Sequence, residues 1–240
     1  MRVDPFAVEV SDAVVQDLRE RIRRTRWPDP APGEPWAEGV DLDYLRDLLE
    51  YWADGFDWRS QERWLNRFEH RVAHVDGLRI HFVLHRAAHG GAPLVLTHGW
   101  PSTFVELLSL VEGLGDRFDL VVPSLPGYAF SQRPRRAGVD RAFVAGLWHR
   151  LIQGLGYQRD YYDNRWHGTP IGPDDFVTAP TAMAVFANEF VPEGQPPRSW
   201  YERLYNIQHW TVYPRGGHFA AAEEPDLLAS DIAEFFANLL

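Results

Sequence analysis

Two continuous apolar runs, residues 94–97 and Phe118–Pro123, place the strongest limits on the fold of this 240-residue chain. Runs of this kind, bounded by turn residues and lacking polar alternation, are typical of parallel strands that are buried on both faces. Apolar residues at helical spacing follow each run, over residues 104–114 and 141–155. Because strands alternate with helices, we predict an α/β fold with a mostly parallel sheet, helices on both faces and right-handed crossovers.

The first 70 residues carry helical spacing and no strand pattern, which predicts a helical meander. Ser11 is the expected N-cap of its first helix. We expect helices over residues 11–26, 43–53 and 61–68. The chain therefore divides into an N-terminal helical extension, residues 1–70, and an α/β domain, residues 71–240.

The α/β domain begins with a predicted hairpin, residues 71–75 and 78–85, joined at Asp76-Gly77. The pattern breaks after residue 155. A buried strand is due there, but residues 158–166 are polar and aromatic, and Pro and Gly follow up to Pro173. Further on we expect strands over residues 181–186 and 207–212, a turn over 214–217 and a last helix over 225–240.

The composition excludes several partners and chemistries. The net charge of −10 argues against nucleic acid and against anionic membranes. The absence of Cys excludes disulfides, a thiol nucleophile and Cys-ligated metal. No apolar run reaches the length of a membrane span, and no signal peptide is visible at the N-terminus. A cytoplasmic protein is therefore expected.

The first apolar run leads into the turn His98-Gly99-Trp100-Pro101. Ligands of open α/β sheets bind beyond the carboxyl ends of the strands. The backbone N–H of Trp100 could there face a developing oxyanion. An ordinary turn between a strand and a helix is the alternative interpretation.

Two side chains that suit acid–base chemistry follow the later strands. His218, after Gly216-Gly217, is a candidate general base, and Glu189 could hold its imidazole in one tautomer. A capping or core histidine and a solvated loop acid are the alternatives. Tyr161 and Tyr162 are candidate proton donors, unless they only pack as aromatic rings. We find no nucleophile elbow between residues 155 and 189 and no metal-binding motif, so no metal or other cofactor is expected.

Six segments carry a family resemblance: LRERIRRTRWPD (18–29), YWADGFDWRSQERWLNRF (51–68), VDGLRIHFV (75–83), LTHGWPST (96–103), VVPSLPGYAFS (121–131) and PRGGHFAAAEEPDLLASDIAEFF (214–236). They resemble the microsomal-type epoxide hydrolases, which are α/β-hydrolases with an N-terminal helical extension. The resemblance runs in two blocks, residues 1–159 and 160–240, and implies a small apolar epoxide as substrate.

The resemblance also implies residue roles. His98, Gly99 and Trp100 correspond to the oxyanion hole, with the Trp100 N–H as donor. His218 corresponds to the base and Glu189 to its orienting acid. Tyr161 corresponds to the residue that protonates the epoxide oxygen, with Tyr162 as the alternative. In the implied mechanism an Asp attacks an epoxide carbon, and water activated by the His then hydrolyses the resulting ester.

The departure from the family lies in the centre of the chain. The strand and elbow that carry the Asp nucleophile, and most of the cap, are missing at a junction near residues 158–160, and residues 160–173 resemble a cap remnant. Asp160 is the only acid at the junction, and nothing places it on an elbow.

Three functions follow from this departure. The chain is an impaired or inactive epoxide hydrolase, a non-catalytic remnant that binds small molecules, or a weak hydrolase in which a His–Glu dyad activates water. If the core closes around the deletion, strands 94–97, 118–123 and 181–186 should be neighbours in one sheet. Otherwise unpaired strand edges favour a homo-oligomer.

Overall fold

The computed structural model describes residues 1–240 except 38, 158–175, 190–194, 238 and 240. The chain forms two compact units. The smaller unit is Ala7–Phe68, and the larger one combines Met1–Phe6 with Glu69–Leu240.

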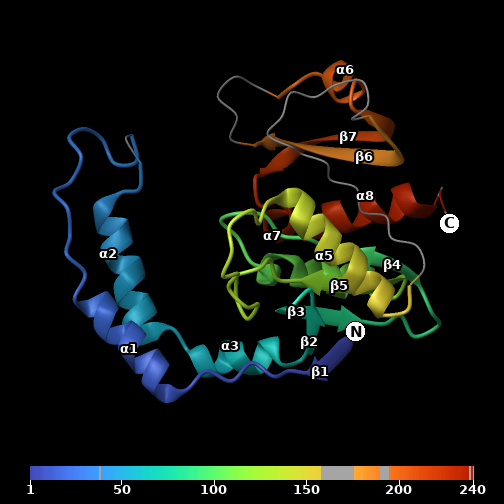
Figure 1. The fold of residues 1–240 in the computed structure, drawn as a ribbon. Helices are drawn as coiled ribbons and strands as arrows, with labels where there is room; N and C mark the ends of the chain where they lie inside the picture. Colours follow the sequence, from blue (N-terminus) through green and yellow to red (C-terminus); the bar gives the residue numbers. More distant parts are fainter. Residues whose placement is uncertain (38, 158–175, 190–194, 238, 240) are drawn as a thin grey trace. The chain divides into compact units, whose positions relative to one another are not determined.

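The smaller unit is built from helices in its described residues, as the spacing predicts. Asp41 and Asp57 cap the second and third helices, since their carboxylates accept the N–H groups of Tyr44 and Ser60. Ser11 precedes the first helix, but its side chain makes no capping hydrogen bond. The elements are α1 (Asp12–Arg23), α2 (Leu42–Glu50), the π-helical turn η1 (Tyr51–Gly55) and α3 (Trp58–Leu65) (Figure 1).

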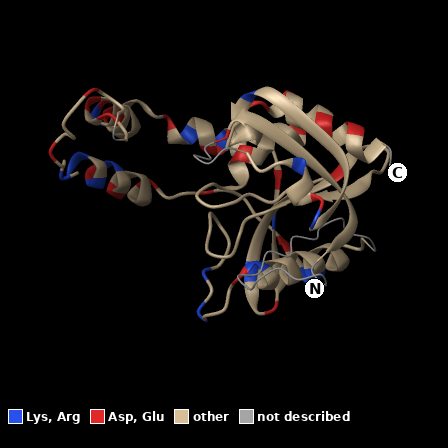
Figure 2. Cartoon of the chain, turned by 90° about the horizontal axis from the view of Figure 1, so that it is seen from above, with Lys and Arg blue, Asp and Glu red and all other residues tan. Residues whose placement is uncertain are grey.

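Polar contacts fix the two chain ends of this unit to each other. The Asn66 side chain both donates to the Val8 carbonyl and accepts its N–H, each at 2.8 Å. Glu62 accepts the Val10 N–H at 2.7 Å. Arginines and acidic residues are interspersed along α1 and α2 (Figure 2), and most of them form exposed ion pairs that contribute little stability.

The larger unit contains a mixed five-stranded sheet in the order β1-β2-β3-β5-β4. The predicted hairpin is confirmed as β2 (Glu69–Val75) and β3 (Leu78–His85), which pair antiparallel. β3 also pairs antiparallel with β5 (Phe118–Pro123), and β4 (Ala92–Val95) pairs parallel with β5. The α/β class is therefore correct, whereas the sheet is mixed rather than mostly parallel.

The expectation that the first third of the chain contains no strand was wrong. Residues Arg2–Pro5 form β1, which pairs antiparallel with β2. A strand of four residues is too short to show a period in the sequence. Its position is instead set by pairing with a strand that lies far along the chain, from His74 opposite Arg2 to Arg71 opposite Pro5.

Helices cover both faces of the five-stranded sheet. The helix α5 (Arg141–Gly154) packs Leu147, Trp148 and Leu151 against Ile80 and neighbouring buried side chains of the sheet. On the opposite face Phe104 makes an edge contact with His81, at 4.9 Å between ring centroids. Phe104 opens the 3₁₀ turn η2 (Phe104–Leu107), which continues into α4 (Leu108–Leu114).

The remaining strands form a separate two-stranded sheet. In it β6 (Val177–Asn188) pairs parallel with β7 (Tyr205–Gly217). The prediction that strand 181–186 would join strands 94–97 and 118–123 in one sheet was therefore wrong. The predicted turn over 214–217 was also wrong, because β7 continues to Gly217. The short helices are α6 (Arg198–Tyr201) and α7 (Ala220–Glu223).

The last helix, α8 (Pro225–Ala237), explains why the second sheet stays apart from the first. Its Asp231 is 4% exposed and lies 3.0 Å from His209 Nε2 and 3.1 Å from the Tyr213 hydroxyl, both on β7. Burial and the Asp231 carboxylate raise the pKa of Tyr213 to about 12. α8 also contacts β6 and α4. The β6–β7 pair is thus fixed to α8 instead of extending the β4 edge.

A buried histidine pair lies in the centre of the five-stranded sheet. His81, on β3, is fully buried, and its Nε2 lies 2.9 Å from Nδ1 of His70 on β2. Its Nδ1 lies 2.8 Å from the Ser124 hydroxyl at the end of β5. Burial, together with the neighbouring His70, lowers the pKa of His81 from 6.5 to about 3.

We therefore predict a specific loss of stability in acid. The unfolded chain binds a proton on His81 below pH 6.5, whereas the folded chain does so only near pH 3, so the free energy of unfolding falls as the pH decreases through this window. Urea titrations from pH 7 to pH 4 should give His81→Asn a shallower fall, by up to about 1.4 kcal/mol per pH unit. The control His89→Asn, at an exposed position, should show the same dependence of the free energy of unfolding on pH as the parent. If His81→Asn also keeps the parent's dependence on pH, His81 is not its source.

Candidate active site

The turn after β4 is fixed by a buried histidine. His98 is 2% exposed, and its Nδ1 donates to the Gly99 carbonyl at 3.0 Å. Its Nε2 accepts the Leu125 N–H at 3.1 Å, so the ring is neutral with both nitrogens engaged. Burial lowers the pKa of His98 as well. His98 therefore joins the turn to the loop after β5 and has no free nitrogen for chemistry.

Hydrogen bonds to His81, in the centre of the sheet, hold the loop after β5. The Ser124 hydroxyl bonds to His81, and the Ser131 hydroxyl donates to the Ser124 carbonyl at 2.8 Å. The backbone N–H of His81 in turn donates to Ser131 Oγ at 3.0 Å. Since Leu125 bonds to His98, hydrogen bonds connect the sheet centre to the turn before Trp100.

Trp100 lies at the exposed tip of the turn. The residue is 78% exposed, and its peptide bond to Pro101 is cis. The Trp100 N–H makes no hydrogen bond within the described part of the chain. This leaves the N–H available to an oxygen of a bound molecule, and its role as an oxyanion donor stays a prediction.

A cavity of about 830 Å³ lies beside this turn. Its walls come from β4, the turn, α4, the loop after β5, the start of α5 and α8. Most lining side chains are apolar, among them Val95, Leu110, Val144, Leu228 and Ile232. The volume falls in the range of pockets that enclose small organic ligands.

The ends of β6 and β7 bring the predicted acid and base together. Asn188 and Gly217 are paired in the parallel register, so the residues that follow them, Glu189 and His218, are neighbours. Glu189 Oε1 lies 2.8 Å from His218 Nδ1. The carboxylate accepts the Nδ1 proton, which leaves Nε2 as the basic nitrogen. The His218 side chain is 56% exposed, so water has access to the imidazole.

Close contacts leave no room for a side chain at the two positions before His218. A Cβ at Gly217 would lie 2.9 Å from the Asn188 carbonyl oxygen. A Cβ at Gly216 would lie 2.7 Å from the Phe186 ring, and the φ angle of Gly216 is +86°. Any larger residue would push β7 from β6 at the point where the acid and base meet.

Other predicted site residues are not part of this arrangement. Tyr161, Tyr162 and Asp160, together with the proposed cap remnant, lie outside the described residues. In the described part of the chain, His218 and Glu189 do not line the cavity beside the turn. The structure thus yields two half-sites, the turn with its cavity and the His–Glu pair.

Sequence reasoning missed two polar clusters, the buried His70–His81–Ser124 chain and the partly buried Asp231–His209–Tyr213 cluster. Only Asp231 left a signal, as an acid among the apolar residues of the last helix. The described residues contain no group of His, Cys, Asp and Glu that could hold a metal ion. None of the described helices has the length and apolar character needed to cross a membrane.

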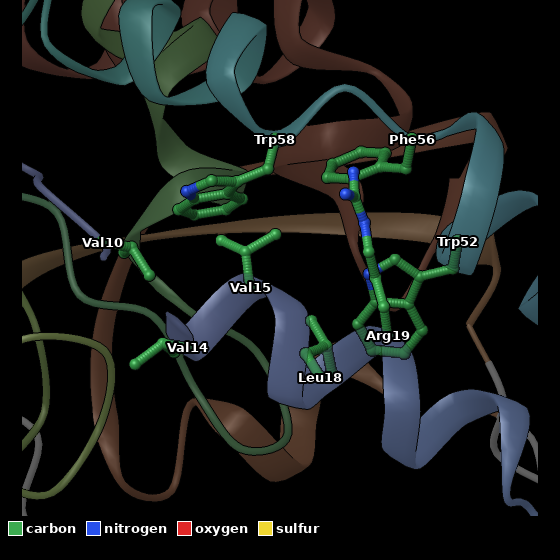
Figure 3. A pocket seen from close by; sticks show the side chains of 8 residues that line it. All are labelled: Val10, Val14, Val15, Leu18, Arg19, Trp52, Phe56 and Trp58. Atoms are coloured by element: carbon green, nitrogen blue, oxygen red, sulfur yellow. The ribbon is translucent and has the colours of Figure 1, made fainter. Parts of the chain in front are cut away.

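The smaller unit carries a cavity of its own, of about 140 Å³. Figure 3 shows Val14, Val15 and Leu18 of α1 together with Trp52 and Trp58, and Arg19 is the one charged side chain in its lining. The cavity lacks an acid–base pair, so we assign it no chemistry.

Comparison with known proteins gives consistent results. Residues 3–107 match the family described as "Epoxide hydrolase N terminus". A protein of Stigmatella aurantiaca (strain DW4/3-1) is 40% identical over 166 residues, which cover 65% of this chain and 38% of that protein. Epoxide hydrolase 1 of Sus scrofa is 32% identical over 174 residues, and the aligned part makes up 66% of this chain and 38% of that protein. The chain therefore spans much less than the full length of these relatives.

The fold is similar to solved epoxide hydrolase structures. The juvenile hormone epoxide hydrolase of the silkworm Bombyx mori superposes with a TM-score of 0.84 at 19% identity, covering 99% of this chain and 94% of that one. At this identity the similarity concerns the fold. It shows that the chain has the α/β fold of these hydrolases.

The His–Glu pair gives a testable prediction for the tautomer of His218. Glu189→Gln removes the carboxylate that stabilises the Nδ1–H form, so ¹⁵N chemical shifts of the neutral ring should change from that form to a mixture of tautomers. Glu223→Gln is the matched control, because Glu223 bonds to the neighbouring Phe219 N–H and not to the ring. Unchanged shifts in Glu189→Gln would show that the carboxylate does not orient the imidazole.

Proposed function

Because the chain resembles the epoxide hydrolase family, we propose that it binds a small apolar epoxide in the cavity beside Trp100 but does not complete the family's two-step hydrolysis. The observation that carries this proposal is the largely apolar cavity of about 830 Å³, which has the unused Trp100 N–H at its rim. The chain would act as an impaired epoxide hydrolase that retains substrate binding.

The chemistry of the bound epoxide supports this choice. Its ring oxygen is a hydrogen-bond acceptor on an apolar body, and the Trp100 N–H offers a donor beside apolar walls. Aromatic or other xenobiotic epoxides would suit a lining rich in Leu, Val and Ile side chains. His98 would contribute by holding the turn, since both of its nitrogens are engaged.

The missing step is the formation of the ester. Two-step hydrolysis needs a carboxylate nucleophile on an elbow, and the sequence between residues 155 and 189 contains no such elbow. Loss of the nucleophile from a comparable covalent mechanism costs about 10⁶-fold in rate. The proposal therefore separates binding, which persists, from turnover, which is lost.

A second candidate is direct hydrolysis by the His218–Glu189 dyad, which the 2.8 Å contact between these side chains favours. Nε2 of His218 would take a proton from water while the water oxygen attacks an epoxide carbon. The C–O bond of the ring would break, and the resulting alkoxide would take a proton from solvent to give the diol. Tyr161, or alternatively Tyr162, would supply that proton in the family's arrangement.

The proposal also covers the location of the chain, its partners and its oligomeric state. An acidic chain without Cys suits a cytoplasmic location, where disulfides are rare. We expect neither nucleic acid nor membrane as a partner, because the net charge is −10. Self-association into a homo-oligomer is favoured by strand edges that have no partner among the described residues, such as the outer edge of β6, and sedimentation would measure it.

The experiment combines binding and turnover with styrene oxide as the probe. Calorimetry should detect binding, and Leu228→Trp, which fills the cavity, should abolish it. Diol formation should not exceed that of buffer. If diol does form and His218→Gln removes it, the dyad candidate is correct. If single turnover in H₂¹⁸O labels the protein, an ester forms and the proposal is wrong. Absence of binding would also refute it.

A further inference from the structure

Tyr128 belongs to the lining of the large cavity and comes from the loop after β5. Its ring makes an edge contact with the His98 ring, at 5.5 Å between ring centroids and 62° between ring planes. His98 also donates to the carbonyl of Gly99, the residue before Trp100. The same buried histidine therefore contacts the Tyr128 ring and holds the turn of Trp100.

The loop holds the backbone of Tyr128 on both sides. The Tyr128 N–H donates to the Leu125 carbonyl, and the Tyr128 carbonyl accepts the Ser131 N–H, both at 2.9 Å. The next residue, Ala129, has a φ angle of 43°, in the left-handed region that residues with a Cβ rarely adopt. Such a conformation persists only where the surrounding contacts fix it. The position of Tyr128 is therefore set before a ligand binds, which lowers the cost of binding.

The hydroxyl of Tyr128 is accessible and unused. It makes no hydrogen bond within the part of the chain that the structure describes. The Thr97 hydroxyl, in the same cavity lining, also lacks a partner there, but it is inaccessible. The Tyr128 hydroxyl is not among the inaccessible atoms without a partner, so water reaches it. A phenol hydroxyl can donate one hydrogen bond and accept others.

The other polar side chains of the lining suit a neutral ligand less well. Both nitrogens of His98 are engaged. The Asp140 carboxylate caps α5, and Arg141 is not free of partners. The accessible donors that remain belong to Trp100, at the tip of the turn, and to Tyr128, against the His98 ring.

We propose that Tyr128 is a binding residue of this cavity, and that its hydroxyl donates a hydrogen bond to the oxygen of a bound epoxide. The inference rests on the proposed binding of an epoxide and deepens it, because it names a side chain that orients the epoxide ring. An epoxide oxygen has two lone pairs, so a bond from Tyr128 leaves one for the Trp100 N–H. The cavity therefore distinguishes an epoxide from a hydrocarbon of the same shape.

The test compares two ligands of the same shape on the intact chain. Styrene oxide carries the epoxide oxygen, and cyclopropylbenzene has a CH₂ group in its place. NMR titrations give the dissociation constants. Tyr128→Phe removes the hydroxyl and keeps the ring, so it should weaken styrene oxide by about five- to tenfold, the usual effect of one hydrogen bond. It should leave the affinity for cyclopropylbenzene unchanged.

A matched control removes a hydroxyl elsewhere. Tyr44→Phe changes an exposed tyrosine on α2 of the smaller unit, so it should alter the affinity for neither ligand. Far-UV circular dichroism of both variants should match that of the parent.

A measurement on the parent does not depend on the folding of a variant. The ¹³Cζ resonance of Tyr128 reports on the hydrogen bonding of its hydroxyl, and contacts with the His98 ring allow its assignment by nuclear Overhauser effects. Styrene oxide should shift this resonance more than cyclopropylbenzene does. Equal shifts would show that the ligand reaches the ring and not the hydroxyl, and would overturn the inference.

Two further results would overturn the inference alone. Equal affinity of the parent and Tyr128→Phe for styrene oxide would show that the hydroxyl does not bind the ligand. Equal weakening of both ligands would show that the ring only packs in the wall. Both results leave epoxide binding in place, so the proposed function survives them. If the parent binds neither ligand, the proposed function fails, and the inference fails with it.

Discussion

The open edge of β4 is the constraint on which the rest of the structure depends. β4 pairs with β5 on one side, and within the described part of the chain its other side faces a cavity of about 830 Å³ and no further strand. Because β4 leads directly into the turn of His98 and Trp100, the same feature determines the surroundings of the candidate oxyanion donor. The open edge and the proposed loss of the nucleophile belong to one hypothesis, that the chain lacks the segment that follows α5 in the family it resembles.

The His218–Glu189 half-site depends on the pairing of β6 with β7 and not on the open edge of β4. The parallel register of β6 and β7 places Glu189 beside His218, and Gly217 allows the close approach of the two strand ends. α8 holds this sheet through the buried Asp231. The candidate base and the candidate oxyanion donor are thus positioned by separate parts of the fold. This is why we separate binding from turnover.

Local patterns allowed much of the fold to be predicted from the sequence. The hairpin of β2 and β3, the buried strand β5 and the helix α5 were all visible as apolar periods with turn or capping residues. The His218–Glu189 pair was predicted because each residue follows a strand. Long-range pairing was not predictable in the same way: β1 is defined by its contact with β2, and β6 by its contact with β7 and α8.

Two errors have a clear physical origin. Pro214 and Gly216 are turn formers, yet β7 continues through them because Gly216 and Gly217 fit closely against Phe186 and Asn188. The expected closure of the core assumed that unpaired strand edges must find each other. The buried carboxylate of Asp231 instead binds His209 and Tyr213 on β7, an interaction that no periodicity reveals.

Among the described strands, β4 and β6 lie in separate sheets. Cross-strand nuclear Overhauser effects from the backbone of Val95 test it most directly, since paired strands bring backbone protons close together. The structure predicts effects from Val95 to the Val121 region of β5 and none to residues 181–186. Effects between Val95 and residues 181–186 would show that the core closes and would contradict the account.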